Sequence, residues 1–273
     1  MYMINSKHID IFQGENLKKY KNITKSKKYI VFDLDETIGS FSEVYSLFLK
    51  LKTIEQEEKK EIYKSDKELL FHLLDLNPEF FRYGIEIVFK YLYEKKKHNK
   101  DLYIYIYTNN SCLPIEWTSW ISEYLEQKWQ VKKLFTNIVR AFKIKGKIIE
   151  SNRSSLSKKY EDFIKCVQID ENSQLCFIDN IEHIRMKHKN VYYLKPKPYY
   201  HYVNKNNILD RFLDSIYGKK IENQIDNFSE KIKKIYLHEK DEQYTRSEED
   251  FETDVLISKT ILEHIQQFFY MKL

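Results

Sequence analysis

The chain contains 273 residues, of which 42% are hydrophobic and 32% charged, so it is long enough to bury a sizeable core. No apolar run approaches the roughly 20 residues that a membrane-spanning helix requires, and the first residues lack the apolar core of a secretion signal, so the sequence predicts a cytoplasmic protein without a membrane segment. The formal net charge of +5 comes with abundant Lys, Asn, Ile and Tyr, which have AT-rich codons, and it is therefore weak support for nucleic-acid binding.

The first predicted element is a strand. A basic stretch from Lys18 to Lys28 ends at Tyr29-Ile-Val-Phe-Asp-Leu, a short apolar run typical of a strand that is buried on both faces. Residues 42–76 follow. They are rich in Leu, Glu and Lys and contain no Gly or Pro, and they predict two helices separated near Lys64, which form an insert or a small cap.

Beyond residue 77 the predicted helices and strands alternate. Helices are expected at about 78–94, 114–129 and 158–166, and strands at 102–107, 137–142, 174–178 and 190–194. This alternation predicts an α/β fold in which a Rossmann-like parallel sheet is covered by helices on both faces.

The last part of the chain is predicted to be helical, with candidates at 208–217 and 225–236. Residues 238–254 carry eight acidic and two basic side chains, which predicts a solvated linker before an amphipathic helix at 255–269. The expected organisation is therefore a catalytic domain at 1–215, containing the helical insert at about 42–76, and a helical C-terminal extension with an acidic linker at 216–273.

The strongest chemical signal is Asp33-Leu-Asp35-Glu-Thr37, which follows the first strand directly. Open α/β sheets bind ligands at the carboxyl ends of their strands, and a spacing of two in an extended segment puts Asp33 and Asp35 on the same side. Asp33 suits the nucleophile of a phosphoryl transfer through an aspartyl phosphate, and Asp35 suits the general acid and base. The alternative is a pair of solvated loop acids or a helix cap, but an apolar strand followed by DxDxT is a long and specific pattern.

This pattern resembles the haloacid dehalogenase superfamily and, within it, the carboxy-terminal-domain phosphatases, whose first motif is DxDxT. The resemblance covers about residues 28–200. The chain is also similar in general character to the proteins of this superfamily found in large DNA viruses. It implies the haloacid dehalogenase fold. Thr108, which ends the strand at 102–107, matches the second motif, where a hydroxyl and a neighbouring backbone amide, here that of Asn109, hold the phosphate.

The third and fourth motifs of the family have matches later in the chain. Lys158 is the best match for the lysine that balances the charge of the phosphate and the nucleophile, with Lys159 as the alternative. Phe177-Ile-Asp179-Asn180 matches the acidic motif that follows the fourth strand.

The resemblance also implies a cofactor, Mg²⁺, which prefers an octahedral shell of oxygens. Its implied protein ligands are Asp33, the backbone carbonyl of Asp35, and Asp179 or Asn180. Arg140 lies where some relatives bind the substrate phosphate through a guanidinium fork, and a surface salt bridge is the alternative role for this side chain.

The predicted function is therefore a magnesium-dependent phosphatase that acts on a phosphorylated substrate, in first place a phosphoserine or phosphothreonine protein. A small-molecule or nucleic-acid-end phosphatase, with the 42–76 helices as a lid, remains an alternative. A binding or scaffold protein of the same fold that has lost turnover is the alternative from another class, although the presence of Asp33, Asp35, Thr37, Thr108 and Asp179 argues against it. The sequence does not predict an oligomeric state.

Overall fold

The computed structural model describes residues 2–5, 8–18, 27–61, 63–237 and 248–270. The chain forms two compact units and passes between them at four places. The first unit comprises Met1–Gly39, Arg82–Tyr199 and Glu248–Leu273, and the second comprises Ser40–Phe81 and Tyr200–Ser247. This division differs from the expected one at 215, because the helices at 42–76 join the helices that follow residue 200, whereas the last helix belongs to the first unit.

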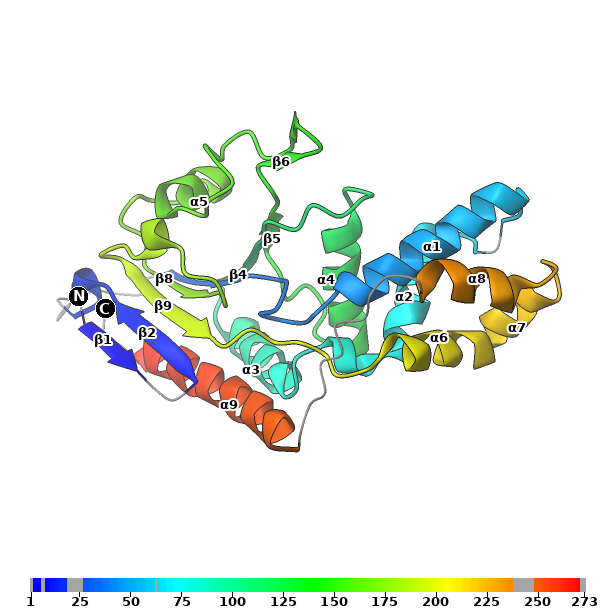
Figure 1. Cartoon of the computed structure of the whole chain (residues 1–273). Helices are drawn as coiled ribbons and strands as arrows, with labels where there is room; N and C mark the ends of the chain where they lie inside the picture. Colours follow the sequence, from blue (N-terminus) through cyan, green and yellow to red (C-terminus); the bar gives the residue numbers. More distant parts are fainter. Residues whose placement is uncertain (1, 6–7, 19–26, 62, 238–247, 271–273) are drawn as a thin grey trace. The chain divides into compact units, whose positions relative to one another are not determined.

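The first unit is built on a seven-stranded sheet with the strand order β1-β2-β9-β8-β3-β4-β5 (Figure 1). The five strands from β9 to β5 are parallel, whereas β1 and β2 add antiparallel pairs at the β9 side, which the sequence did not predict. The mostly parallel sheet is compatible with a Rossmann-like arrangement. Its strands are β1 (Tyr2–Asn5), β2 (Ile9–Gln13), β3 (Lys28–Phe32), β4 (Leu102–Tyr107), β5 (Asn137–Val139), β8 (Leu175–Ile178) and β9 (Val191–Pro196).

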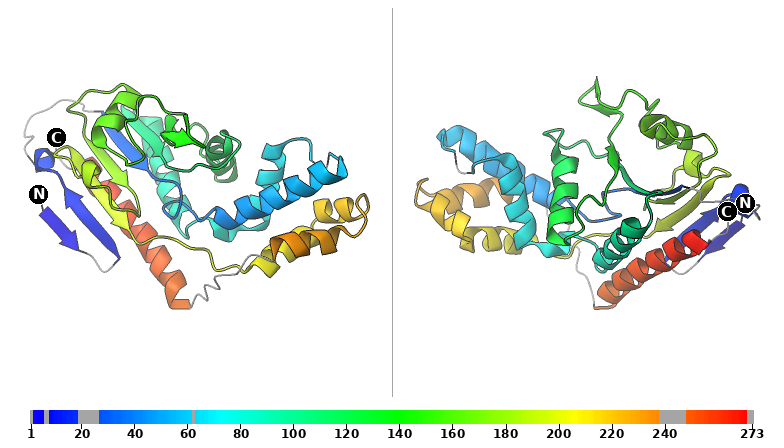
Figure 2. Two further views of the ribbon diagram at one scale, coloured as in Figure 1. Left: turned by 45° about the horizontal axis from the view of Figure 1, so that its top comes forward. Right: turned by 180° about the vertical axis from the view of Figure 1, so that it is seen from behind.

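Helices cover both faces of this sheet. Two of them, α3 (Ile85–His98) and α9 (Glu248–Tyr270), lie side by side against one face (Figures 1 and 2). On the other face α5 (Tyr160–Val167) packs the ring of Phe163 at 5.5 Å from that of Tyr105. Because both faces are covered, every residue of β3 and β8 is buried, which explains their unbroken apolar runs.

The remaining elements of the first unit are short or follow a strand end. They are η1 (Glu15–Lys18), α4 (Trp117–Lys128), the hairpin of β6 (Lys143–Ile144) and β7 (Lys147–Ile148), and η3 (Ile184–Met186). The third core strand is shorter than predicted: β5 ends at Val139, and residues 140–142 lie outside it.

The last helix, α9, is longer than the sequence predicts. It begins at Glu248 rather than at residue 255, so the second part of the expected acidic linker is helical, and residues 238–247 of that linker lie outside the described residues. Acidic side chains are favourable in the first turn of a helix, where the helix dipole is positive. In the part of the chain that the structure describes, no helix is both long enough and apolar enough to cross a membrane.

The second unit is helical. It contains the two helices predicted for 42–76, and Ser65 caps the second of them by accepting a hydrogen bond from Glu68 N at 3.2 Å. The helix predicted at 78–94 is divided into a short 3-10 helix, η2, and the helix α3. Gly84, at φ +77, lies between them and directly precedes α3. The unit consists of α1 (Ser42–Glu58), α2 (Asp66–Leu76), η2 (Pro78–Phe80), α6 (Lys205–Asp214), α7 (Ile216–Glu222) and α8 (Phe228–Tyr236).

Two helix pairs hold the second unit together. The chain segments that form each pair are far apart in sequence: α1 packs against α8, and α2 packs against α6. A guanidinium fork links the two segments as well, since Arg211 donates to both carboxylate oxygens of Glu79 at 2.9 and 2.8 Å.

Candidate active site

Three neighbouring strands bring polar residues to one edge of the sheet. The register pairs Phe32 of β3 with Ile178 of β8, so the next residues, Asp33 and Asp179, emerge side by side. On the other side of β3, the parallel strand β4 ends at Tyr107, and Thr108 is the next residue. The order of the strands also changes direction at β3. The next strands in the chain, β4 and β5, are added on one side of β3, whereas the later strands β8 and β9 are added on its other side. Open α/β sheets bind ligands at such a switch point.

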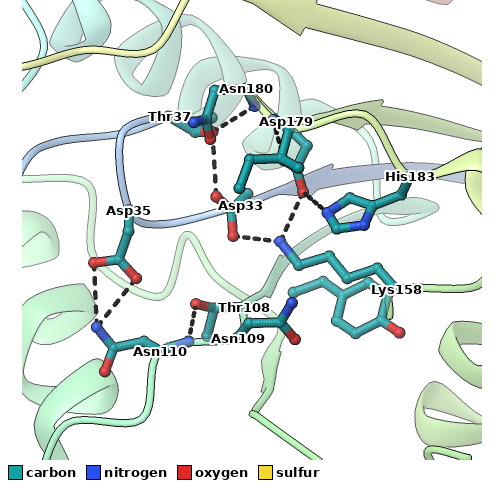
Figure 3. A network of polar contacts seen from close by, with 12 residues as sticks. Asp33, Asp35, Thr37, Thr108, Asn109, Asn110, Lys158, Asp179, Asn180 and His183 are labelled. Carbon is teal, nitrogen blue, oxygen red and sulfur yellow. Dashed lines mark hydrogen bonds and ion pairs between the residues drawn. The ribbon is translucent and has the colours of Figure 1, made fainter. Parts of the chain in front are cut away.

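A buried lysine joins the two strand ends. Lys158 Nζ donates to Asp33 Oδ1 and, at 2.7 Å, to Asp179 Oδ2 (Figure 3). His183 Nε2 lies 3.2 Å from the same oxygen of Asp179. The side chains of Lys158, Asp33 and Asp179 are 2%, 7% and 0% exposed, so this ionic cluster is almost completely removed from water.

The charges of this cluster depend on one another. Burial raises the pKa of Asp33, and the charge of Lys158 opposes this shift only in part. Burial also acts to raise the pKa of Asp179, but the charge of Lys158 and the contact with His183 outweigh it and lower that pKa. Burial acts to lower the pKa of Lys158, whereas Asp179 and Asp33 raise it. A single ammonium thus faces two buried carboxylates.

Thr37 brings a second pair of oxygens together. Its hydroxyl lies 3.3 Å from Asp33 Oδ2 and 2.9 Å from Asn180 Oδ1, and it accepts a hydrogen bond from Asn180 N at 3.0 Å. The hydroxyl has one proton, so it donates to one of the two oxygens at a time and the other keeps its lone pairs. A carboxylate oxygen and an amide oxygen that converge in this way are ligands of the type that Mg²⁺ binds.

Asp35 has a partner that sequence reasoning missed. Asn110 Nδ2 donates to both carboxylate oxygens of Asp35 at 3.1 Å (Figure 3). Asn110 Oδ1 accepts a hydrogen bond from Cys112 N at 3.0 Å, which fixes the amide. Burial raises the pKa of Asp35, and the hydrogen bond from Asn110 opposes the shift. Asn110 therefore orients the Asp35 carboxylate. Its place just after β4 resembles a simple turn in the sequence.

We expect Asn110→Ala to lower the kcat of any reaction that depends on Asp35 by about 10- to 100-fold, because a hydrogen bond to a charged group is lost. The measurement is steady-state kinetics together with thermal unfolding. Asn152→Ala, at an exposed asparagine, is the matched control and should leave kcat unchanged. An unchanged kcat in Asn110→Ala would show that the orientation of Asp35 does not limit the reaction.

A buried arginine organises the loops on the β4 side. Arg153 donates through Nη1 to Thr108 O at 3.0 Å and to Arg140 O at 2.7 Å, and through Nη2 to Asn109 Oδ1 at 2.6 Å. The predicted phosphate arginine, Arg140, directs its own Nη2 to Ser119 Oγ on α4. Among the described residues, the side chains of Asn109 and Arg140 form no hydrogen bond or ion pair with Lys158, Asp33 or Asp179. By contrast, Lys158 contacts Asp33 and Asp179, and Thr37 contacts Asp33 and Asn180.

The alternative lysine, Lys159, turns away from the cluster and donates to Ser154 Oγ at 2.6 Å. Across the described ranges, no group of three or more His, Cys, Asp or Glu side chains is arranged to hold a metal ion.

Comparison of the chain with protein-family models, with curated proteins and with solved structures gives no match in any of the three.

Proposed function

We propose that this chain is a magnesium-dependent phosphatase with the haloacid dehalogenase fold. One observation carries the proposal: Lys158 bridges Asp33 and Asp179 at the switch point of a mostly parallel sheet. An ionic cluster of this kind is costly to bury and is seldom the best way to stabilise a core. Its position where α/β sheets bind ligands supports a role in chemistry.

Asp33 and Asp35 divide the reaction between them. A carboxylate oxygen of Asp33 attacks the phosphorus, which forms an aspartyl phosphate and breaks the bond to the leaving oxygen, and Asp35 gives that oxygen its proton. Asp35 then takes a proton from water, which attacks the phosphorus, releases inorganic phosphate and restores Asp33. The raised pKa of Asp35 and its contact with Asn110 suit a group that must hold and return a proton.

The residues of the site also fit the charge of a phosphoryl group. Lys158 supplies a buried cation, and Thr108 Oγ1 accepts from Asn110 N at 2.9 Å, so its own proton can be donated to a phosphate oxygen. Mg²⁺ would be held by oxygens of Asp33 and Asn180, with the backbone carbonyl of Asp35. It would supply the positive charge that a single ammonium beside two carboxylates does not provide.

The substrate class that we propose is a protein phosphorylated on serine or threonine. This choice rests on the resemblance of Asp33-Leu-Asp35-Glu-Thr37 to the carboxy-terminal-domain phosphatases. Phosphopeptides compared with nucleotides and nucleic-acid ends, at equal concentration, distinguish this class from the alternatives: a kcat/KM at least about tenfold higher for phosphopeptides is expected.

The experiment that tests the function is hydrolysis of a chromogenic aryl phosphate by the purified chain, with Mg²⁺ and with a chelator. We expect turnover with Mg²⁺ and its loss on chelation, restored by added Mg²⁺. Turnover that is equal in chelator would contradict the magnesium requirement. A folded protein that shows no turnover with Mg²⁺ on any of these phosphate esters would contradict the phosphatase and favour a binding protein.

A further inference from the structure

Arg82 is a charged residue that lies next to residues 33–39, the candidate catalytic loop, and only 1% of its surface is exposed. Its Nε donates to Thr37 O at 2.7 Å and its Nη2 donates to Glu36 O at 2.8 Å. Its backbone N–H donates to Ile38 O at 2.9 Å. One residue therefore holds three successive carbonyls of the segment that directly follows Asp35.

This segment needs to be held. Glu36 adopts φ +54, a left-handed conformation that is unfavourable for a residue with a side chain. The turn folds Glu36 N back to Gly39 O at 2.7 Å, and it directs the Thr37 hydroxyl towards Asp33. A backbone of this kind persists only when its surroundings fix it. The side-chain orientations of Asp33, Asp35 and Thr37 therefore depend on the hydrogen bonds that Arg82 makes to this segment.

The charge of Arg82 is balanced from α9. Its Nη1 lies 3.4 Å from Asp254 Oδ1, and Asp254 is itself only 2% exposed. Its Nη2 also donates to Lys197 O at 2.8 Å. Removal of the Asp254 carboxylate takes negative charge away from beside a buried guanidinium, which favours movement of the Arg82 side chain towards water.

The helix that carries Asp254 has its own anchors further along. Ser258 Oγ donates to Tyr83 O, Tyr192 Oη lies 2.8 Å from His264 Nδ1, and Lys28 Nζ donates to Phe268 O at 3.2 Å. These contacts fix α9 on Tyr83, which precedes α3, and on the strands β9 and β3, and none of these residues belongs to the segment 33–39. The effect of a substitution at Asp254 can therefore be separated by experiment from the effect of weakening the attachment of α9.

We propose that Asp254 is a positioning residue for the candidate active site: its carboxylate keeps Arg82 on the carbonyls of residues 36–38 and so holds Asp33 and Asp35 in their reactive directions. The effect on turnover rests on the proposed phosphatase function. The effect on the loop itself does not.

The test compares Asp254→Asn with Ser258→Ala, which removes an anchor of the same helix one turn away. In Asp254→Asn we expect kcat for the aryl phosphate to fall by at least about tenfold, with KM changed by less than about twofold, because the reacting groups are misdirected while phosphate binding is kept. Peptides that cover residues 34–40 should exchange their amide hydrogens faster than in the wild type. Ser258→Ala should keep kcat and the exchange of residues 34–40 while lowering Tm.

Equal kcat and equal exchange in the two variants, measured well below both Tm values, would overturn the proposal. If Asp254→Asn does not fold, Asp254→Glu takes its place, because it keeps the charge and displaces it by one methylene. The same slower kcat and faster exchange relative to Ser258→Ala are then expected, and their absence counts against the proposal. If the wild type lacks phosphatase turnover, the proposed function fails, and the exchange of residues 34–40 alone decides the role of Asp254.

Discussion

Asp33→Asn should reduce magnesium-dependent hydrolysis of an aryl phosphate by at least about 1,000-fold, because the amide cannot act as the nucleophile. The variant should remain folded. Asn has nearly the same shape as Asp, and burial already raises the pKa of Asp33, so the loss of this charge removes part of the cost of burying the cluster. The measurement is kcat together with Tm for the variant and the wild type.

The matched control for this change is Asp210→Asn, at an exposed carboxylate of α6, which should leave both kcat and Tm unchanged. Residual turnover in Asp33→Asn above about a tenth of the wild-type rate would mean that another group attacks the phosphorus. The proposal that the reaction passes through an aspartyl phosphate at Asp33 would then be wrong.

Lys158→Met should affect stability as well as turnover. Met fills much of the same volume but leaves the buried carboxylates of Asp33 and Asp179 without their shared ammonium. Breaking a buried ion pair by removal of one partner costs about 3–5 kcal/mol, so we expect a fall of this size in the free energy of unfolding and loss of turnover. Denaturant unfolding measures the first effect and aryl phosphate hydrolysis the second.

Two comparisons make this prediction specific. Lys159→Met removes a lysine whose Nζ contacts Ser154, outside the cluster, and it should change the free energy of unfolding by less than about 1 kcal/mol. The double variant Asp33→Asn/Lys158→Met should recover part of the stability that Lys158→Met loses, because one of the two unpaired carboxylates is gone. A double variant no more stable than Lys158→Met would show that repulsion at Asp33 is not the cause.

The sequence predicts the core strands well, since apolar runs such as Tyr29-Ile-Val-Phe end at polar residues where strands end in the structure. Lys158, Asp179 and Asn180 were singled out by the resemblance to the haloacid dehalogenase superfamily; in the structure Lys158 contacts Asp33 and Asp179, and Asn180 contacts Thr37. The partners Asn110 and His183 were missed. Their contacts with Asp35 and Asp179 depend on loop shapes that no periodicity encodes.

The positions of the arginines could have been used to predict residues with a structural role. The chain has only six among 46 basic residues, so a position that is Arg rather than Lys deserves a structural reason. Arg82, Arg153 and Arg211 each make three or more hydrogen bonds with the fork of a guanidinium. Their partners lie far away in the sequence, which is also why the division into two units could not be predicted from local patterns.

The two-segment construction of the second unit has a consequence for folding. A chain made from its amino end produces α1, with its apolar stripe of Val44, Leu47 and Leu51, long before it produces α8, against which α1 packs. Closing such a long loop is slow, and the stripe is exposed to wrong partners in the meantime. The same holds for the first unit, where α3 packs against α9, a helix that is synthesised much later. Each unit therefore lacks part of its packing until its last helix, α8 or α9, has been synthesised.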